Sequence, residues 1–505
     1  MFQPCIALMV LVSSAREDEL PALLAKAKEA LGRLLAPETH VESLGRAEVH
    51  GARGTFRVLL AGDGRFRSEV HSALPEGSGF DGATVWTRDP AGLECIVELG
   101  EADRLRLFHA VLSGHWLDGR EFTLAAAEDE SHPGHELRLG LEGSPLEMRL
   151  TLDAASHLPC ELLEAGEAGA RTWTFADYTA VDDIRFPRRW ELQEQGDRGL
   201  FEVEVYHGVP EVERAFSVTL APPRDVHFDP EVESELEVTR LPSGHLLVQP
   251  LIEGEDLGPF IFDTGAGITV IDKAVADELL FETLGSTVAI GVVGSTTTAF
   301  RRGERFQLGP VVLENPIYGD LDLGFLRTAA GRKVAGIVGY DLLARCVVVL
   351  EPATPRIELH DPATFRLEGG TWQPLVLHDD TPCARARYEG EHVGLFRLDS
   401  GASGTVTFHV PTVDARRLLE GRAVSASLSG GVGGTAAALE GELAWFELAG
   451  HRFEKPRVSF SRATSGAFLD RYTDGNIGAS FLGAFRLVLD YGQRRIAFLP
   501  RGGKR

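Results

Sequence analysis

The sequence is poor in residues and spacings that bind transition metals. Five cysteines occur in 505 residues, and no two of them form a CxxC pair. The 16 histidines include no HExxH sequence. Zinc sites depend on such close spacings, so we expect neither a metal site nor a cofactor. If Cys5 is removed with a leader, two cysteines remain in each half (Cys95, Cys160, Cys346 and Cys383), which is enough for disulfides without demonstrating any.

Positive charge is also scarce. Lys and Arg number 50 against 75 Asp and Glu, which gives a formal net charge of −25 at pH 7. A nucleic-acid partner requires clustered basic residues that neutralise phosphates, so we expect none. Hydrophobic residues make up 44% of the chain, as is ordinary for globular proteins. The length exceeds what one hydrophobic core supports, and it predicts two or three domains.

Long hydrophobic runs are missing, and none could span a bilayer. Residues 6–12 form a short apolar stretch, followed by the small residues Ser13, Ser14 and Ala15. This pattern resembles a secretory leader, so we expect a signal peptide at residues 1–15 and a periplasmic or secreted protein. The stretch lacks a basic start, and a plain N-terminal strand of a cytoplasmic protein is the alternative.

The first half of the chain alternates in a way that is typical of β-sheet. Leucine and alanine recur at helical spacing over residues 20–34, which predicts one amphipathic helix. From Val49 to Phe216, short alternating runs are broken by Gly, Pro and Asp, as in antiparallel strands with one wet face. We therefore expect a mainly β protein that begins with a curved antiparallel sheet (an open barrel) carrying a helix, at residues 16–225. The Pro-containing segment 221–230 and the acidic run after it are read as a linker, which we place at residues 226–240.

The second half contains an internal repeat. The sequence GPFIFDTGA at residues 258–266 recurs as GLFRLDSGA at 394–402, and GVVGST at 291–296 recurs as GGVGGT at 430–435. GYDLL at 339–343 recurs as GASFL. Because the matches follow in the same order at nearly constant spacing, we expect a duplicated β lobe at residues 241–362 and 370–500. The expected elements of the two lobes are hairpins at 245–252/259–263 and 383–388/393–399, short helices at 272–280 and 411–419, and closing strands at 346–350 and 486–489.

Each repeat centres on an apolar strand that ends in an acid, Asp263 or Asp399. A two-fold relation between the lobes would bring these carboxylates together. Two carboxylates about 3 Å apart share one proton and titrate as a pair. One can then act as base on a water molecule while the other acts as acid toward a peptide carbonyl.

The residues next to the acids suit that task. Thr264 and Ser400 carry hydroxyls that could hydrogen-bond across the two strand ends, and Gly265 and Gly401 allow a tight turn beside the acids. The glycine-rich segments suit loops that close over a substrate. The glycines of these expected flaps are Gly291, Gly294, Gly430 and Gly433.

Residues 240–500 as a set resemble the bacterial two-lobed members of the retropepsin-like (pepsin-related) aspartic proteases. The resemblance implies a catalytic dyad of Asp263 and Asp399, and an apolar-apolar-Gly element behind each acid. Ile337-Val338-Gly339 matches that element, whereas the second copy carries Asn476. Arg397 stands where the first repeat has the apolar residue Ile261. We expect both residues to contact substrate. A cation there would lower the pKa of the dyad or attract an acidic substrate side chain, unless it merely pairs with a nearby acid.

The first half resembles the open-barrel lipoprotein-carrier (LolA/LolB-like) domains, through its leading helix, its strands and the sequence GFDGATVWTRDP at residues 79–90. The resemblance implies an apolar cavity and contact with a lipid or lipoprotein. Four tryptophans could line such a cavity, although each is more often a plain core residue: Trp86, Trp116, Trp173 and Trp190.

The function expected from these features is that of an aspartic endopeptidase acting on an extended polypeptide. The alternative is a non-catalytic envelope binding or carrier protein that uses the first domain for a lipid or lipidated partner. A third reading, in which the first domain is an inhibitory propeptide, fits less well because propeptides are usually shorter and more basic.

Overall fold

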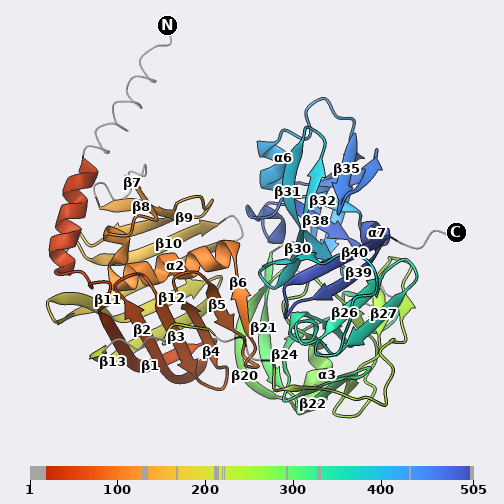
Figure 1. Ribbon diagram of the computed structural model, residues 1–505, viewed down its shortest axis with the longest axis horizontal. Helices are drawn as coiled ribbons and strands as arrows, with labels where there is room; N and C mark the ends of the chain where they lie inside the picture. The colour runs from red at the N-terminus through yellow and green to blue at the C-terminus, as the bar shows by residue number, and fades with distance from the viewer. Residues whose placement is uncertain are drawn as a thin grey trace, which may run out of the picture. The chain divides into compact units, whose positions relative to one another are not determined.

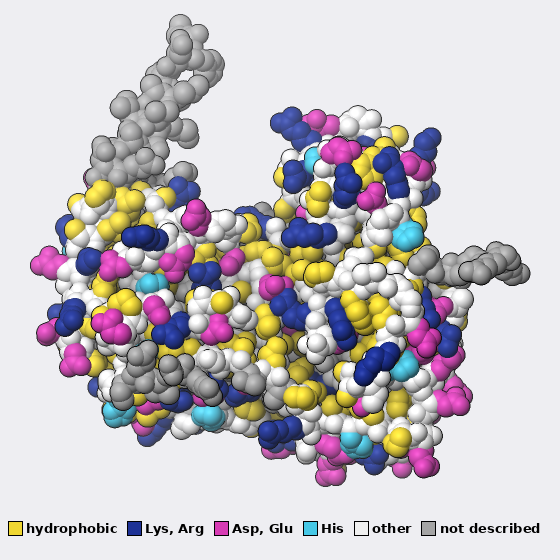
Figure 2. All heavy atoms as spheres, viewed as in Figure 1, with side chains coloured by type: hydrophobic (Ala, Val, Ile, Leu, Met, Phe, Trp, Pro, Cys, Tyr) yellow, Lys and Arg dark blue, Asp and Glu magenta, His cyan; other side chains and the backbone are white. Residues whose placement is uncertain are grey.

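The computed structural model describes residues 19–126, 135–166, 169–209, 215–218, 220, 222–291, 294–326, 331–431 and 434–500. The expected signal peptide, residues 1–15, lies outside this range. Strands account for 51% of the residues and helices for 12%, so the expectation of a mainly β protein is confirmed. The chain divides into two compact units, Met1–Leu220 and Ala221–Arg505. On the face shown in Figure 2, acidic and basic side chains are interspersed over the surface of each unit.

The first unit is built on one 13-stranded antiparallel sheet (Figure 1). Its strand order places β6 and β7 at the two edges, and these edge strands do not pair with each other, so the sheet is open. Its strands are β1 His40–Val49, β2 Ala52–Ala61, β3 Phe66–His71, β4 Glu76–Phe80, β5 Val85–Arg88, β6 Glu94–Val97, β7 Phe122–Ala126, β8 Glu136–Leu141, β9 Glu147–Leu152, β10 Pro159–Gly166, β11 Gly169–Val181, β12 Ile184–Glu194 and β13 Asp197–Val209.

Two helices accompany this sheet. The helix expected from the leucine spacing is present at residues 19–31. A second helix, α2 (Leu99–Ser113), lies where the sequence pattern predicted strands alone, and there that prediction was wrong. It contacts β2, β4, β8 and β12, so the sheet curves around it. A helix covered on several sides lacks the one-sided apolar stripe that reveals a surface helix.

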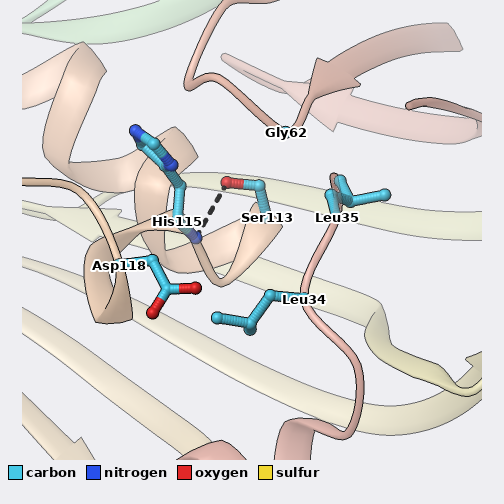
Figure 3. A pocket seen from close by; sticks show the side chains of 6 residues that line it. All are labelled: Leu34, Leu35, Gly62, Ser113, His115 and Asp118. Atoms are coloured by element: carbon cyan, nitrogen blue, oxygen red, sulfur yellow. Dashed lines mark hydrogen bonds between the residues drawn. The ribbon is translucent and has the colours of Figure 1, made fainter. Parts of the chain in front are cut away.

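The tryptophans of the first unit are buried. Trp116, Trp173 and Trp190 belong to its main hydrophobic core, and Trp86 lies beneath the guanidinium of Arg67. The reading of these tryptophans as core residues is therefore confirmed. A cavity of about 20 Å³ lies beside the core (Figure 3), which is room for about one water molecule and not for a lipid chain. Its lining residues are Leu34, Leu35, Gly62, Ser113, His115 and Asp118.

The segment expected to be a linker, 226–240, is instead part of the second unit. Strand β14 (Val226–Phe228) pairs with β23, and the preceding Asp225 forms an ion pair of 2.6 Å with Arg345. The backbone N–H of Leu236 donates to Ile357. Acidic and Pro-rich composition predicted a linker, but backbone pairing and a buried cation hold this segment in place.

The second unit contains two sheets whose pairings correspond strand for strand. In one, β18 pairs in parallel with β25, β25 with β19, β19 with β24, and β24 with the hairpin β20–β21. In the other, β31, β38, β32, β37 and the hairpin β33–β34 pair in the same order and directions.

The first half of this unit also contains a smaller, four-stranded sheet. Besides β14, the strands of this sheet and of the first of the two corresponding sheets are β15 Thr239–Arg240, β16 Leu246–Val248, β17 Leu251–Ile252, β18 Phe260–Phe262, β19 Val270–Asp272, β20 Glu282–Ile290, β21 Ser295–Arg302, β22 Arg305–Leu308, β23 Val311–Glu314, β24 Ile317–Leu321 and β25 Gly336–Val338. The second uses β29 Val376–His378, β30 Thr381–Tyr388, β31 His392–Asp399, β32 Val406–Phe408, β33 Ser425–Gly431, β34 Gly434–Glu442, β35 Trp445–Leu448, β36 His451–Glu454, β37 Arg457–Ser461 and β38 Gly475–Gly478. The accompanying helices are α3 Lys273–Glu278, α5 Tyr340–Leu343, α6 Val410–Ala415, the 3₁₀ turn η2 Ala467–Leu469 and α7 Ala479–Leu482.

A five-stranded sheet joins the two halves of this unit. Strand β26 (Val347–Glu351) follows the first half and pairs antiparallel with β39 (Phe485–Asp490) from the end of the second. Buried valines on both strands pack together, so the two closing segments share one core. The remaining strands are β27 Arg356–His360, β28 Gln373–Pro374 and β40 Arg495–Pro500. Of the helices in the described part of the chain, none is long and apolar enough to cross a membrane.

Candidate active site

Two corresponding strands carry the paired acids to one place. Asp263 follows β18, and its backbone N–H donates to Val338 of the parallel strand β25 at 3.2 Å. Asp399 is the last residue of β31 and lies opposite Gly478 of the parallel strand β38. The residues just before the acids, Phe262 and Leu398, are buried. The apolar strand ends therefore fix the two carboxylates at the edge of a packed core.

The glycines beside the acids let the two segments meet closely. A Cβ atom on Gly401 would lie 2.2 Å from Cγ of Asp263, and one on Gly265 would lie 2.8 Å from Cγ of Asp399. Each carboxylate thus rests against the glycine of the other segment, where no side chain fits. The N–H groups of Gly265 and Ala402 donate to Oδ1 of Asp263 and of Asp399, at 2.7 and 2.8 Å.

The two carboxylates interact directly. Burial, and next the negative charge of Asp399, raise the pKa of Asp263 to about 8, while the N–H of Gly265 opposes this shift. A hydrogen bond between the two carboxyl groups contributes in the same upward direction. At neutral pH the pair therefore retains a proton that two separate aspartates would have lost.

Thr264 and Ser400 form a reciprocal set of four hydrogen bonds beneath the acids. The Thr264 hydroxyl donates to the carbonyl of Leu398 at 2.7 Å and accepts from the N–H of Ser400 at 2.9 Å. The Ser400 hydroxyl donates to the carbonyl of Phe262 at 2.9 Å and accepts from the N–H of Thr264 at 3.0 Å. Both side chains are buried, so this grip (Thr264 with Ser400) locks the two acid-bearing turns together.

Asn476, which departs from the apolar residue at the same place in the first repeat, contacts the dyad. Its Nδ2 donates to Oδ2 of Asp399 at 2.6 Å, and the residue is buried. The sequence showed that this position departs from the family pattern, but it did not predict the contact with Asp399.

Arg397 and Ile261 occupy corresponding strand positions in different surroundings. Ile261 is buried in an apolar cluster with Val270 and Ile337. Arg397 lies 3.2 Å from Asp470 and 3.8 Å from Asp379. Burial opposes the ionisation of Asp470, but the hydrogen bond from His378 and the charge of Arg397 hold its pKa well below the ordinary value. Arg397 is thus paired with an acid, as one of the two readings of the sequence anticipated.

The glycine-rich segments are the tips of two hairpins. Gly291 and Gly294 join β20 to β21, and the N–H of Gly291 donates to the carbonyl of Gly294 at 3.0 Å. The carbonyl of Gly291 accepts from the N–H of Ala467, across the unit, at 3.0 Å. Gly430 lies at the end of β33, opposite Thr435. Gly433 falls outside the described residues.

His245 contacts the turn that carries Asp399, and the sequence did not predict this contact. Its Nε2 lies 2.7 Å from the carbonyl of Gly401, and its Nδ1 lies 2.7 Å from the hydroxyl of Ser243. The imidazole therefore joins the first half of the unit to the turn that carries Asp399. Its only sequence signal is a short Ser-Gly-His turn, which is too common to have indicated this role.

Metal-ligating groups do not gather at this site. Within the described ranges, no three or more His, Cys, Asp or Glu side chains are placed to hold a metal ion. No disulfide joins the four cysteines in those ranges: Cys95, Cys160, Cys346 and Cys383.

A comparison with known protein families matches part of the chain. Residues 248–342 match the family model described as aspartyl protease. The matched segment contains Asp263, Thr264 and the Ile337-Val338-Gly339 element. It supports an aspartic protease family for this part of the chain, and with it a hydrolase acting on polypeptides. No curated protein matches the chain.

Proposed function

We propose that the chain is an aspartic endopeptidase in which Asp263 and Asp399 activate a water molecule for peptide-bond hydrolysis. The polypeptide binds between two lobes, residues 241–362 and 370–500, beneath the hairpins β20–β21 and β33–β34. The observation that carries this proposal is the seating of each carboxylate against the glycine of the other segment.

In the proposed reaction the two carboxyl groups take complementary roles. The charged carboxylate of Asp399 accepts a proton from the attacking water, and the neutral carboxyl of Asp263 donates its proton to the oxygen of the scissile carbonyl. A neutral tetrahedral diol results. Proton transfer from the dyad to the amide nitrogen then allows the C–N bond to break and releases an amine and a carboxylic acid. The reaction requires no covalent intermediate with the enzyme.

The grip and the hairpins supply positioning. The four hydrogen bonds of Thr264 and Ser400 hold the carboxylates in one fixed relation, which a shared proton requires. The bond between Gly291 and Ala467 links the tip of one hairpin to the opposite half, so polypeptide entry requires this bond to open. Arg397 adds little free positive charge because Asp470 neutralises it.

The test is cleavage of unfolded casein by the purified chain over a range of pH. Asp263→Asn and Asp399→Asn should each reduce cleavage at least about 1,000-fold while preserving the fold, because asparagine fills the same space without a shareable proton. Asp414→Asn, a change at an exposed acid on α6, is the matched control and should retain activity. Cleavage that survives both dyad substitutions would rule out the mechanism.

Export to the periplasm or beyond remains part of the proposal, and fractionation of cells that express the full chain tests it. The carrier alternative predicts lipid copurified with the first unit, which mass spectrometry would detect. No described feature favours that alternative: the core of the first unit is filled by buried side chains such as Trp116 and Trp190.

A further inference from the structure

The correspondence between the two sheets fails at one buried position beside the dyad. Ile337 in β25 and Asn476 in β38 occupy the same place in the repeat, two residues before Gly339 and Gly478. Both are buried, with 8% and 7% of their surface exposed. Ile337 packs in an apolar cluster, so the first half offers its acid no side-chain donor from this position. The amide at Asn476 must therefore have a partner or a function.

The side-chain amide of Asn476 donates a hydrogen bond to the dyad. The Nδ2 atom lies 2.6 Å from Oδ2 of Asp399, and Oδ1 of the same carboxylate accepts the N–H of Ala402 at 2.8 Å. Backbone donors serve Asp263 as well, through Gly265 and Gly401. The side-chain amide is thus an addition on the Asp399 side. A buried donor to a carboxylate favours its charged form over its protonated form.

Other charged groups near Asp399 do not replace this bond. Arg397 lies opposite Asn476 in the β31–β38 register, but its charge is engaged by Asp470 and Asp379. The titratable side chains around the dyad and behind Arg397 are Asp263 after β18, Asp379 and His378 at the β29–β30 turn, His409 before α6, Asp470 after η2, and His245 beside Gly401.

We propose that Asn476 is a positioning residue that holds Oδ2 of Asp399 as a hydrogen-bond acceptor and thereby makes Asp399 the base and Asp263 the acid. The inference rests on the proposed peptidase function, since it assigns roles within that reaction. The two halves then act unequally because only the second provides a side-chain amide to its acid.

The experiment compares Asn476→Ile, which copies the first half, with Asn476→Asp, which keeps the shape. Two readouts are taken: the pH dependence of kcat and KM for casein peptides, and ¹³C NMR titration of Asp-labelled protein, with Asp263→Asn and Asp399→Asn samples to assign the dyad signals. In Asn476→Ile, the acid limb of kcat and the first dyad ionisation should move to higher pH by about one to two units. KM should change less than twofold.

Asn476→Asp should behave differently. Its introduced carboxyl can donate only while protonated, so activity should persist at acid pH and be lost at least tenfold as that carboxyl ionises next to Asp399. Glu454→Gln, an exposed change in β36, is the matched control and should leave both readouts unchanged. This pair of opposite pH responses is not expected from a residue that serves packing alone.

The proposal is overturned if the acid limb and the first ionisation of Asn476→Ile move by less than about 0.3 units. It is also overturned if Asn476→Asp shows the wild-type pH profile, a result that remains informative should the isoleucine variant fail to fold. NMR titration does not depend on turnover. A chain that cleaves nothing but shows the shift would therefore refute the peptidase function while upholding the contact.

Discussion

The Thr264–Ser400 grip illustrates how single hydroxyls can hold a site together. Thr264→Val keeps the shape but leaves the carbonyl of Leu398 and the N–H of Ser400 without partners. We expect the free energy of unfolding to fall by about 1–3 kcal/mol, and casein cleavage to fall at least tenfold because the carboxylates lose their fixed relation. Urea unfolding and cleavage assays measure the two effects.

Ser43→Ala is the control for that change. Ser43 is also a buried hydroxyl residue, and its hydroxyl donates to the carbonyl of Val58 within the first unit, which carries neither acid. It should lose stability comparably or less, and retain most of its activity. Equal losses of activity in the two variants would show that the grip has no special role.

The protonation of Asp263 should be visible in stability. Burial and the nearby charge of Asp399 raise the pKa of Asp263 to about 8, whereas an unfolded aspartate titrates near about 3.9. Between these values the native chain holds a proton that the unfolded chain has released. The contribution of this group is therefore fully present below about pH 4 and is lost as pH rises through about 8.

Asp263→Asn removes this dependence because asparagine does not titrate. Urea unfolding of both proteins between pH 4.5 and pH 9 should show the wild type losing stability relative to the variant as the pH rises. Parallel curves over that range would mean that Asp263 titrates normally in the folded chain.

Sequence reasoning reached the acids because they recur with their flanking residues, but it could not reach contacts set by strand register. The repeat predicted that Asp263, Asp399, Thr264 and Ser400 come together. Asn476 contacts Asp399 only because β38 runs beside β31 and parallel to it, and strand neighbours cannot be read from the sequence. His245 joins the Gly401 turn from the other half for the same kind of reason.

At the scale of elements, the two glycine-tipped hairpins differ in backbone conformation. Gly294 has φ +76°, where an L side chain is strained, although open space surrounds it. Gly430 has no positive φ, and an added Cβ would meet only ordinary contact with Thr435 at 3.7 Å. Gly294→Ala should therefore cost about 1 kcal/mol of unfolding free energy, with Gly430→Ala within about 0.5 kcal/mol of the wild type.

Thermal and urea unfolding of the two alanine variants would check this contrast. Because the hairpin β20–β21 also reaches Ala467 through Gly291, the strained variant should raise KM for casein peptides, and the unstrained variant should not. Equal behaviour of the two variants would show that the tip of β20–β21 adjusts its backbone freely.

Elements with a clear local signal were predicted, and those defined by long-range packing were not. The expected short helices at 272–280 and 411–419 correspond to α3 and α6. Helix α2 was missed because the surrounding sheet covers it on several sides. Segment 226–240 was misread because its pairing with β23 and the contact of the preceding Asp225 with Arg345 join residues about 85–120 positions apart, beyond any local pattern.

At the scale of the whole molecule, the groups to which we assign the proposed reaction lie in one of the two units. Both acids, the grip, Asn476 and both hairpins lie after residue 221, and the first unit has a hydrophobic core of its own. The closing strands β26 and β39 pair with each other, which ties the two halves of the second unit into one body. A unit with its own core and its own backbone pairing is expected to fold independently.

A chain reduced to residues 221–505 should therefore fold and cleave casein within about threefold of the full-length rate, since every group that acts on the peptide bond is retained. Calorimetry of the full chain should show two transitions, one of which coincides with that of the fragment. The same fragment with Asp263→Asn is the control for contaminating proteases. The calorimetric transition of the fragment shows whether it folds. If the fragment folds and yet is inactive, catalysis depends on the first unit, and that unit must contribute to substrate binding.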